Sequence, residues 1–453
     1  MKVIIVGAGE LGRLLAKILS HGNHEVVVID SSYEELERLG DQFDIMRIEG
    51  SCTSVSVLKE AGAENAQALL AVSGDEASNI IACQIASKLG IRQTICRLFR
   101  ADSISEKDGV SPESFGIWKT FSTPEVSVRK IMEILQNRAV LEHIQFGHPD
   151  ACMEIVRITD ASGLVGVRLR DIAEPEILNT VRIAAILHNN SQFLIPSGDT
   201  VIGKNDRLYV AGTKAHVRDF VDTITGYAIT TAPRVVIAGA SVTGVLLANM
   251  AFEAGYDVRL IERSKRIAES VRDDLPTGLM IVQGDFTSEL LLEEAGAGSA
   301  DVFVSTANDD EDNILSCIMA KRIGAKKVVA LTHKPEYIRI IPAMDLIDCG
   351  FSSSLTSVNT ILRFFISGTM RLDANLLHLG ASFSEYKITK KSPIVGLALK
   401  DCQFPPGTIL ALIFRDGEVV TPSGSTTLQV NDTAVAIVTA DTAKRLEPLF
   451  PKD

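Results

Sequence analysis

The chain has 453 residues and a formal net charge of −12. A chain of this length is too long for one hydrophobic core and is expected to form two to four domains. The acidic balance argues against nucleic acid or an anionic lipid surface as the main partner. The seven cysteines are scattered and form no Cys-x-x-Cys pair, so we expect reduced thiols, with neither a disulfide framework nor a zinc site.

The chain opens with an apolar strand, Val3 to Val6, that runs into Gly7-Ala8-Gly9-Glu10-Leu11-Gly12 and an amphipathic helix. In such a turn Gly7 permits the tight bend, Gly9 lets the backbone approach a pyrophosphate, and Gly12 lets the helix pack on the strand. The helix N-terminus supplies unpaired N–H groups and a positive dipole end for phosphates. This pattern predicts a phosphate-binding loop.

A second strand, Glu25 to Ile29, ends at Asp30, which lies 18 residues after Gly12. A carboxylate at that distance can accept hydrogen bonds from ribose hydroxyls, with Ser31 beside it. Strand, glycine loop and carboxylate together predict a Rossmann nucleotide site. The alternative is a βα turn whose glycines serve packing only.

Strands and helices continue to alternate after Asp30, with strands expected at Ile45–Ile48, Ala68–Val72 and Thr94–Arg97. This alternation predicts a doubly wound parallel sheet with its ligand at the carboxyl ends of the strands. Further candidate ligand contacts at that edge are Ser51, Cys52 and Thr53, where an adenine could sit, Ser73, and Arg97. Arg97 either pairs with phosphate oxygens or forms a surface ion pair; the loop from Ser73 either lines the ligand or caps the next helix.

Thr123 and Pro124 begin a long helix, expected to reach Phe146, whose apolar residues recur at helical spacing. This helix either packs on its own sheet or crosses to another unit. From about Ala151 the chain becomes β-rich with polar turns, which predicts a small α+β module followed by a linker at 226–233.

The sequence then repeats itself. Arg234 to Gly244 repeats the opening strand and loop, Asp257 to Glu262 repeats the strand ending at Asp30, and Pro422-Ser423-Gly424 repeats Pro196-Ser197-Gly198. The fold class is therefore α/β, with two Rossmann-type doubly wound parallel-sheet domains, each followed by a small α+β module, in a tandem duplication. We expect the four domains at residues 1–140, 141–228, 229–372 and 373–453.

The second Rossmann unit departs from the first in two places. Ser241 stands where Gly9 stood, and Leu331 stands where Arg97 stood. We expect a weaker, altered or purely structural second site. Its candidate ligand contacts are Gly239, Ser241, Val242, Gly244, Glu262, Asp285 and Phe286.

No HExxH motif and no convincing Ser/His/Asp set is present, so we expect no catalytic residues and no enzyme activity. The acidic run 308–312 could bind a divalent cation, but a helix N-terminal turn is the favoured interpretation, and no metal site is assigned. Val235 to Phe252 has 18 residues without a charge, the lower limit for a membrane span, yet it matches the opening βα unit and is expected to be one.

These motifs resemble those of the Trk potassium-uptake regulatory subunits, which are tandem "regulator of K+ conductance" (RCK) proteins. The resemblance runs from Met1 to about Leu449. It is carried by Ile4 to Gly12, Val28-Ile29-Asp30, Lys59-Glu60-Ala61-Gly62-Ala63, Asp75-Glu76-Ala77-Ser78-Asn79, Leu260-Ile261-Glu262-Arg263 and Leu399-Lys400-Asp401.

The resemblance implies a non-catalytic, cytoplasmic gating ring that associates peripherally with the inner face of the cell membrane. In such proteins NAD(H), ATP or ADP binds the Rossmann clefts and shifts the ring between conformations. The implied partners are an integral membrane K+ channel subunit of the Trk/Ktr type and further copies of this chain, as a dimer or tetramer. The alternatives from the residues are an NAD-dependent oxidoreductase and a regulator of another cation transporter.

Overall fold

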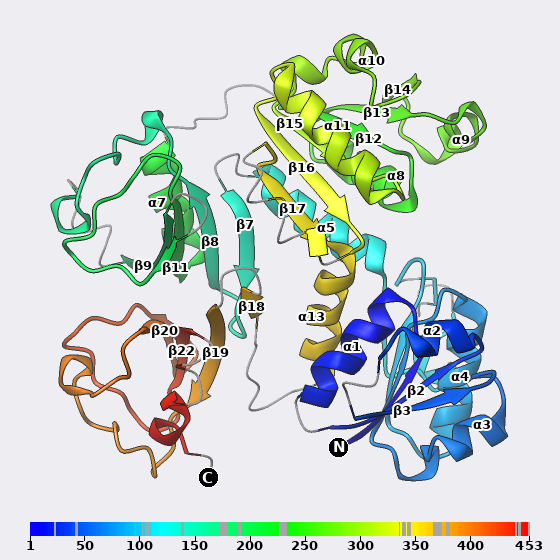
Figure 1. The fold of residues 1–453 in the computed structure, drawn as a ribbon, viewed down its shortest axis with the longest axis horizontal. Helices are drawn as coiled ribbons and strands as arrows, with labels where there is room; N and C mark the ends of the chain where they lie inside the picture. The colour runs from blue at the N-terminus through cyan, green and yellow to red at the C-terminus, as the bar shows by residue number, and fades with distance from the viewer. Residues whose placement is uncertain are drawn as a thin grey trace.

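A computed structural model describes residues 1–21, 24–40, 44–101, 103–104, 109–136, 140–172, 180–188, 192–225, 233–334, 336–337, 341, 346–365, 374–376, 381–439, 442 and 445–451. Figure 1 shows two α/β units, blue and green to yellow, beside two smaller β-rich modules, green and orange to red. Most of the expected linker, 226–232, lies outside the described residues.

The first unit is built around a six-stranded parallel sheet of order β3-β2-β1-β4-β5-β6. Its elements are β1 (Lys2–Val6), α1 (Glu10–His21), β2 (Glu25–Asp30), α2 (Tyr33–Glu37), β3 (Ile45–Glu49), α3 (Val55–Glu60), β4 (Ala68–Ala71), α4 (Glu76–Lys88), β5 (Gln93–Arg97), β6 (Lys119–Phe121) and α5 (Thr123–Gln136). The four inner strands, β2, β1, β4 and β5, are largely apolar and buried because helices cover both faces. The predicted doubly wound parallel sheet is confirmed.

The second unit repeats this order as β14-β13-β12-β15-β16-β17. Its elements are β12 (Arg234–Ala238), α8 (Val242–Glu253), β13 (Asp257–Glu262), α9 (Lys265–Ser270), β14 (Met280–Gln283), α10 (Glu289–Glu294), β15 (Val302–Ser305), α11 (Asp310–Arg322), β16 (Lys327–Thr332), β17 (Cys349–Ser352) and α13 (Ser353–Phe365). The charge-free segment from Val235 therefore forms β12 and α8, as expected. Within the described residues no helix combines the length and apolarity that a membrane span requires.

Each small module is a five-stranded antiparallel sheet, ordered β10-β9-β11-β8-β7 and β21-β20-β22-β19-β18. The first contains β7 (Val140–Gln145), β8 (Ala151–Arg157), β9 (Val181–His188), β10 (Gln192–Leu194), β11 (Arg207–Thr213) and α7 (Lys214–Thr225). The second contains β18 (Ala374–Leu376), β19 (Ala381–Lys387), β20 (Thr408–Arg415), β21 (Glu418–Val420) and β22 (Thr433–Thr439). The equivalent strand orders confirm the tandem duplication.

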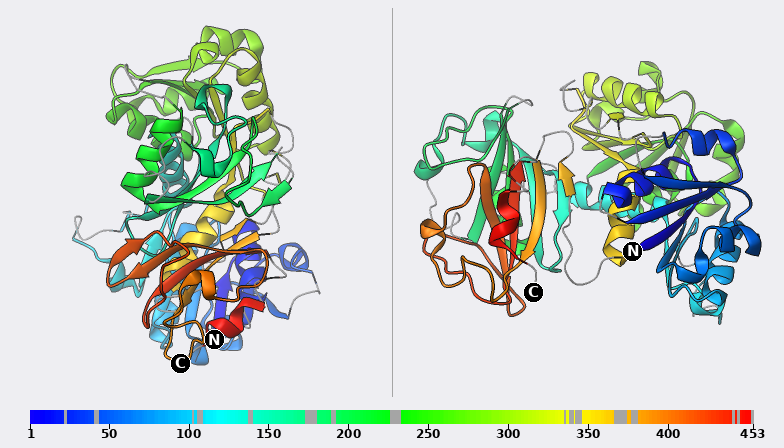
Figure 2. Two further views of the ribbon diagram at one scale, coloured as in Figure 1. Left: turned by 90° about the vertical axis from the view of Figure 1, so that its left-hand side faces the viewer. Right: turned by 60° about the horizontal axis from the view of Figure 1, so that its bottom comes forward.

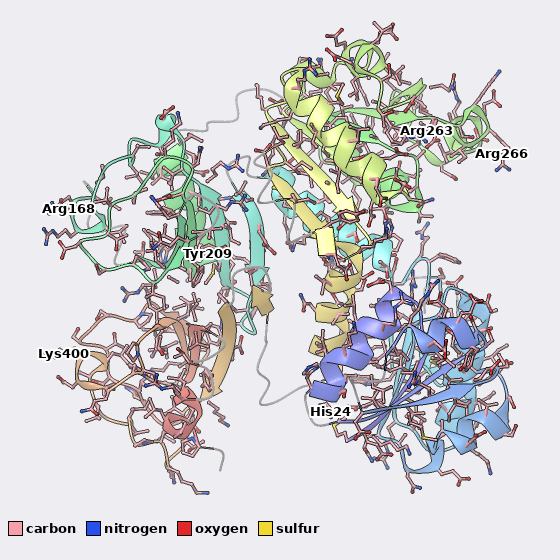
Figure 3. The ribbon with its side chains drawn as sticks, in the orientation of Figure 1. His24, Arg168, Tyr209, Arg263, Arg266 and Lys400 are labelled. Carbon is pink, nitrogen blue, oxygen red and sulfur yellow. The ribbon has the colours of Figure 1, made fainter. Side chains whose placement is uncertain are left out.

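The two modules pack side by side (Figure 2). The Gly147 N–H donates to Glu385 at 2.9 Å, and the His148 ring lies 5.5 Å from the Phe414 ring between centroids. Tyr209, labelled in Figure 3, is fully buried in the middle of the first module's sheet.

The two Rossmann units exchange their last helices. Ile131 and Leu135 of α5 belong to one buried cluster with strands β12 and β15 and helix α8 of the second unit. Ile361 of α13 belongs to the cluster formed by β1, β2 and α1 of the first unit. Figure 1 shows α5 beneath β16 and β17, and α13 alongside α1. Of the two sequence alternatives, the crossing to another unit is therefore the correct one.

The expected helix from Thr123 to Phe146 was too long. Helix α5 ends at Gln136, and Val140–Gln145 forms strand β7, which pairs with β8. The sequence could not reveal this strand, because Val140–Gln145 is a strand only through its pairing with β8.

Replacing Ile131 by Ala should destabilise the protein by about 2–5 kcal/mol, because the side chain is fully buried between the units. Urea-induced unfolding measures the change. The matched control is Ile81→Ala on α4, where the side chain is 42% exposed and the loss should stay below about 1 kcal/mol. Equal losses at the two positions would contradict the helix exchange.

Candidate functional site

The three glycines of the first loop face different surroundings. Gly7 has φ +101°, and a Cβ on it would lie 2.8 Å from the Ser73 Cα. A Cβ on Gly12 would lie 1.8 Å from the Gly7 carbonyl oxygen, whereas a Cβ on Gly9 would meet no neighbouring atom within 4 Å. The fold therefore requires Gly7 and Gly12, but the space beside Gly9 is open.

The predicted carboxylate holds this loop in place. Asp30 accepts the Ala8 N–H at 2.6 Å through Oδ2 and the Ser32 N–H at 2.9 Å through Oδ1. The end of β2 is thereby fixed against the glycine loop of β1, and Asp30 remains partly exposed to the adjacent cavity.

A cavity of about 520 Å³ lies between the two Rossmann units. The predicted residues that line it are Gly7, Gly9, Glu10, Leu11, Asp30, Ser73, Arg97, Ser241 and Val242. The parallel sheets bring them together because the carboxyl ends of the strands share an edge in each unit. The cavity also receives the N-terminal residues of both exchanged helices, Thr123 and Pro124 of α5 and Ser353 and Ser354 of α13.

Arg97 presents a cation to this cavity. Its Nη1 donates to the Val72 carbonyl at 3.4 Å, and burial lowers the pKa of the guanidinium. No carboxylate among the described residues forms an ion pair with Arg97, so the surface ion pair is not what the structure shows. A half-buried guanidinium of this kind is suited to an anionic ligand.

The loop after β4 serves its own helix as well as the cavity. Asp75 caps α4 by accepting the Ser78 N–H at 2.9 Å. The buried Asn79 accepts the Ser73 N–H at 3.0 Å and donates to the Arg97 carbonyl at 3.1 Å. The helix-capping interpretation is therefore correct for Asp75, and Ser73 lines the cavity, where its contact with a ligand stays a prediction.

Several predicted contacts lie outside this cavity, and their ligand roles stay predictions. They are Ala8, Gly12, Ser31, Ser51, Cys52, Thr53, Gly239, Gly244, Glu262, Asp285 and Phe286. Conversely, the sequence reasoning missed Phe99 and His333, which line the cavity from equivalent places just after β5 and β16. The repeat could have pointed to them, because Phe99 and His333 occupy equivalent positions in the two halves of the sequence. The structure shows the same equivalence, since the hydroxyls of Ser122 and Ser352 donate to the carbonyls of Phe99 and His333.

The second glycine loop keeps only the fold-required glycines. Gly239 has φ +94°, and a Cβ on Gly244 would lie 2.0 Å from the Gly239 carbonyl oxygen. In place of Gly9, the hydroxyl of Ser241 accepts the Gly244 N–H at 3.1 Å and donates to the Thr306 carbonyl at 2.6 Å. Ser241 thus caps α8 by pairing one of the N–H groups in its first turn.

The rest of the second site is also internally paired. Glu262 is buried and accepts the N–H groups of Ala240 and Ser264 at 2.8 and 2.7 Å. The Arg263 guanidinium lies over the Phe286 ring at 4.8 Å and pairs with Asp312 at 2.6 Å and with Asp285 at 3.6 Å. Figure 3 labels Arg263 at the side of the second unit that carries α9.

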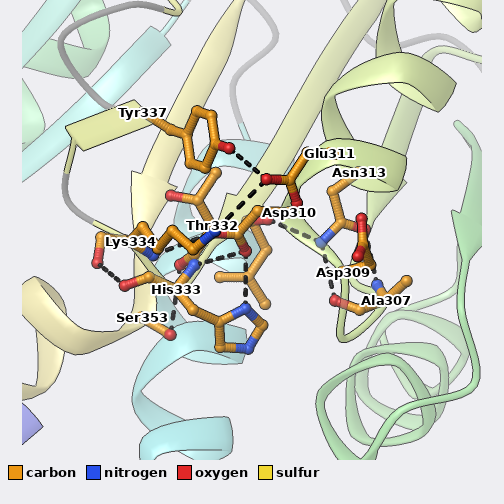
Figure 4. Close-up of polar contacts among 12 residues, drawn as sticks. Ala307, Asp309, Asp310, Glu311, Asn313, Thr332, His333, Lys334, Tyr337 and Ser353 are labelled. Atoms are coloured by element: carbon orange, nitrogen blue, oxygen red, sulfur yellow. Dashed lines mark hydrogen bonds and ion pairs between the residues drawn. The ribbon is translucent and has the colours of Figure 1, made fainter. Parts of the chain in front are cut away.

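The acidic run at the start of α11 is a helix N-terminal turn, as favoured above. Asp309 caps α11 through the Asp312 N–H at 2.8 Å, and Glu311 bonds to Tyr337. Asp310 is buried and accepts the N–H groups of His333 and Lys334 at 2.8 and 3.0 Å, together with His333 Nδ1 (Figure 4).

Comparison with known proteins agrees with this organisation. The TrkA-N domain model matches residues 3–108 and 235–348, and the TrkA-C domain model matches residues 153–225 and 383–450. The chain is 30% identical over 459 residues to Trk system potassium uptake protein TrkA homolog 1 of Methanosarcina mazei, covering 99% of this chain and 100% of that one. The chain belongs to the TrkA family.

Another TrkA relative is the Trk system potassium uptake protein TrkA of Vibrio alginolyticus, 28% identical over 99% of this chain and 98% of that one. Among solved structures, the GsuK RCK domain has a TM-score of 0.59 at 17% identity, covering 99% of this chain and 94% of that chain. The GsuK channel bound to NAD matches with the same TM-score and identity, covering 99% of this chain and 78% of that chain. These neighbours show that this chain has the RCK fold.

Replacing Gly12 by Ala should destabilise the protein by about 1–3 kcal/mol, because the new methyl group would collide with the Gly7 carbonyl. Replacing Gly9 by Ala adds the same methyl group into open space and should cost less than about 1 kcal/mol. Chemical unfolding of the two variants measures the difference. Equal destabilisation would show that Gly9 is also held by packing.

Asp310 gives a pH-dependent prediction. Burial would raise the pKa of this carboxyl, but hydrogen bonds from His333 and Lys334 outweigh burial and hold the pKa below its ordinary value. A lowered pKa contributes stability above the unfolded-state value of about 3.9, and that stability is lost as pH falls through the folded-state pKa. Asp310→Asn should therefore cost about 1–3 kcal/mol at pH 7 and progressively less below about pH 4.

Urea unfolding at several pH values tests this. Asp309→Asn is the matched control, because asparagine caps a helix as well as aspartate does. A loss for Asp310→Asn that does not change with pH would contradict the assignment.

Proposed function

We propose that this chain is a nucleotide-sensing regulatory subunit of a potassium uptake system. It binds NAD(H) or an adenine nucleotide in the cavity between its Rossmann units and acts by changing shape rather than by catalysis. Its partner is an integral membrane K+ channel subunit, and the chain assembles with further copies of itself at the cytoplasmic face of the membrane.

The observation that carries this proposal is the open space beside Gly9. Gly7 and Gly12 are required by backbone packing, and both have counterparts in Gly239 and Gly244. Gly9 has no such internal requirement, and its backbone faces the cavity at the start of α1. A glycine that the fold does not need, placed where a helix N-terminus can meet phosphate, is explained by close approach of a ligand.

The residues present fit a dinucleotide or nucleoside phosphate. The loop from Gly7 to Gly12 would hold the phosphates, Asp30 would accept from a ribose hydroxyl, and Arg97 would pair with a phosphate oxygen. Support also comes from the full-length TrkA relatives named for potassium uptake and from the GsuK channel, whose structure has been solved with NAD. The second loop, where Ser241 fills the place of Gly9, makes the weaker or structural site.

The exchanged helices supply a route for the signal. Helices α5 and α13 begin in the cavity and end in the core of the opposite unit. The Ser357 hydroxyl of α13 bonds to the Thr123 hydroxyl at the start of α5 at 3.2 Å. A ligand that binds one arrangement of the units more tightly than another shifts the population between them, with a coupling of about 1–3 kcal/mol typical of allosteric proteins.

Replacing Gly9 by Asp tests the proposal. The added carboxylate would enter the phosphate position and should weaken NADH or ATP binding by at least about 100-fold, measured by calorimetry on the full chain. The matched control is Gly198→Asp in the first small module, where the new Cβ has only an ordinary contact with Arg170 and binding should be unchanged.

Two outcomes would contradict the proposal. If Gly9→Asp retained the affinity and stoichiometry of the unmodified chain, the first loop would not be the nucleotide site. If the unmodified chain oxidised NADH steadily with small carbonyl compounds, an oxidoreductase would replace the regulatory subunit.

A further inference from the structure

The hairpin that joins the first Rossmann unit to its small module carries three side chains with metal-binding atoms. His143 lies on β7, the edge strand of the sheet, and Cys152 and Glu154 lie on the neighbouring strand β8. No feature of the nucleotide cavity involves them.

The antiparallel register places these three side chains on one face. His143 pairs directly with Glu154, and Cys152 lies two residues before Glu154 on the same side of β8. One imidazole nitrogen, the thiol sulfur and one carboxylate oxygen all lie within 4.8 Å of one another. His143 Nδ1 is 3.4 Å from Glu154 Oε1. Such spacing is close to that of ligand atoms around a tetrahedral metal ion.

The cluster is buried on the side of Cys152 and partly exposed to solvent on the side of His143 and Glu154. Cys152 belongs to the buried apolar cluster beneath α7, whereas the side chains of His143 and Glu154 are 11% and 16% exposed. An ion could therefore enter from the edge of the sheet and meet a thiol inside it.

One carboxylate oxygen of the hairpin, Glu154 Oε2, is buried and has no hydrogen-bond partner among the described residues. A bound divalent cation would give this carboxylate oxygen a partner.

We propose that His143, Cys152 and Glu154 form a zinc site with three protein ligands and one open position. Thiolate, imidazole and carboxylate together select Zn²⁺ over the harder cations Mg²⁺ and Ca²⁺. On binding, the Cys152 thiol releases one proton to solvent, and thiolate and carboxylate together balance the two charges of the ion.

The second module lacks two of these three ligands. Strands β8 and β19 pair with β11 and β22 in equivalent register, so that Ala151 and Ala381 occupy corresponding positions. By this register the second module has Ser382 and Ser384 in the places of Cys152 and Glu154. Serine is close to cysteine in volume, so a serine variant of Cys152 should fold.

The position of the site suggests its effect. The Lys130 ammonium of α5 pairs with Glu142, the residue before His143, at 3.0 Å. An ion held by β7 and β8 would fix this hairpin next to the exchanged helix, which begins in the nucleotide cavity. Zinc would thereby stiffen the connection between the Rossmann unit and its module.

Zinc titration of the chelator-treated full chain against a chromophoric zinc chelator tests the proposal. We expect one zinc ion per chain, with affinity at least about 10-fold weaker in Cys152→Ser and in Glu154→Gln. Cys402→Ser, which removes a free, half-buried thiol of the second module, should bind zinc as the unmodified chain does.

Cobalt substitution supplies a second readout. A thiolate-to-cobalt charge-transfer band should appear in the unmodified chain and disappear in Cys152→Ser, whose unfolding in chelator should match that of the unmodified chain. Unchanged zinc affinity in Cys152→Ser, or a cobalt spectrum without the thiolate band, would reduce the cluster to a cross-strand His143–Glu154 pair and overturn the proposal. Neither result depends on whether nucleotide binds the cavity.

Discussion

The exchange of α5 and α13 is the constraint on which the rest of the structure depends. Each helix leaves the sheet that precedes it and completes the apolar core of the other unit. Neither sheet would have both faces covered without the other unit, so the two Rossmann units fold against each other. The same exchange brings the two glycine loops to one cavity, with the starts of both helices in its wall.

The two glycine loops of the duplicated units differ at Gly9, the one glycine of the first loop that packing does not require. Its equivalent in the second loop is Ser241. Gly7 and Gly12 have counterparts in Gly239 and Gly244, because a side chain at any of these positions would collide with backbone. Ser241 supplies a hydroxyl that caps α8, whereas no such side chain stands at Gly9, which lines the cavity with Glu10 and Leu11 of α1. The same fold thus carries one loop with open space beside Gly9 and one loop in which the Ser241 side chain pairs the Gly244 N–H.

The first small module is tied to the second Rossmann unit by charge as well as by apolar contact. The buried Asp348 of the second unit pairs with Arg157 of the first module at 3.2 Å and with Lys321 at 2.7 Å. Because a buried carboxylate is costly without such partners, this network favours one orientation of module and unit.

The sequence by itself determined the duplication and the parallel sheets, because strand patterning, glycine spacing and the repeat can be read directly from the chain. It did not determine where α5 ends, since β7 is a strand only through its pairing with β8. Nothing in the sequence groups His143 with Cys152 and Glu154 either, because no Cys-x-x-Cys or His-x-x-His spacing connects them. Only antiparallel register places them together, and only the packing of two units makes Phe99 and His333 walls of one cavity.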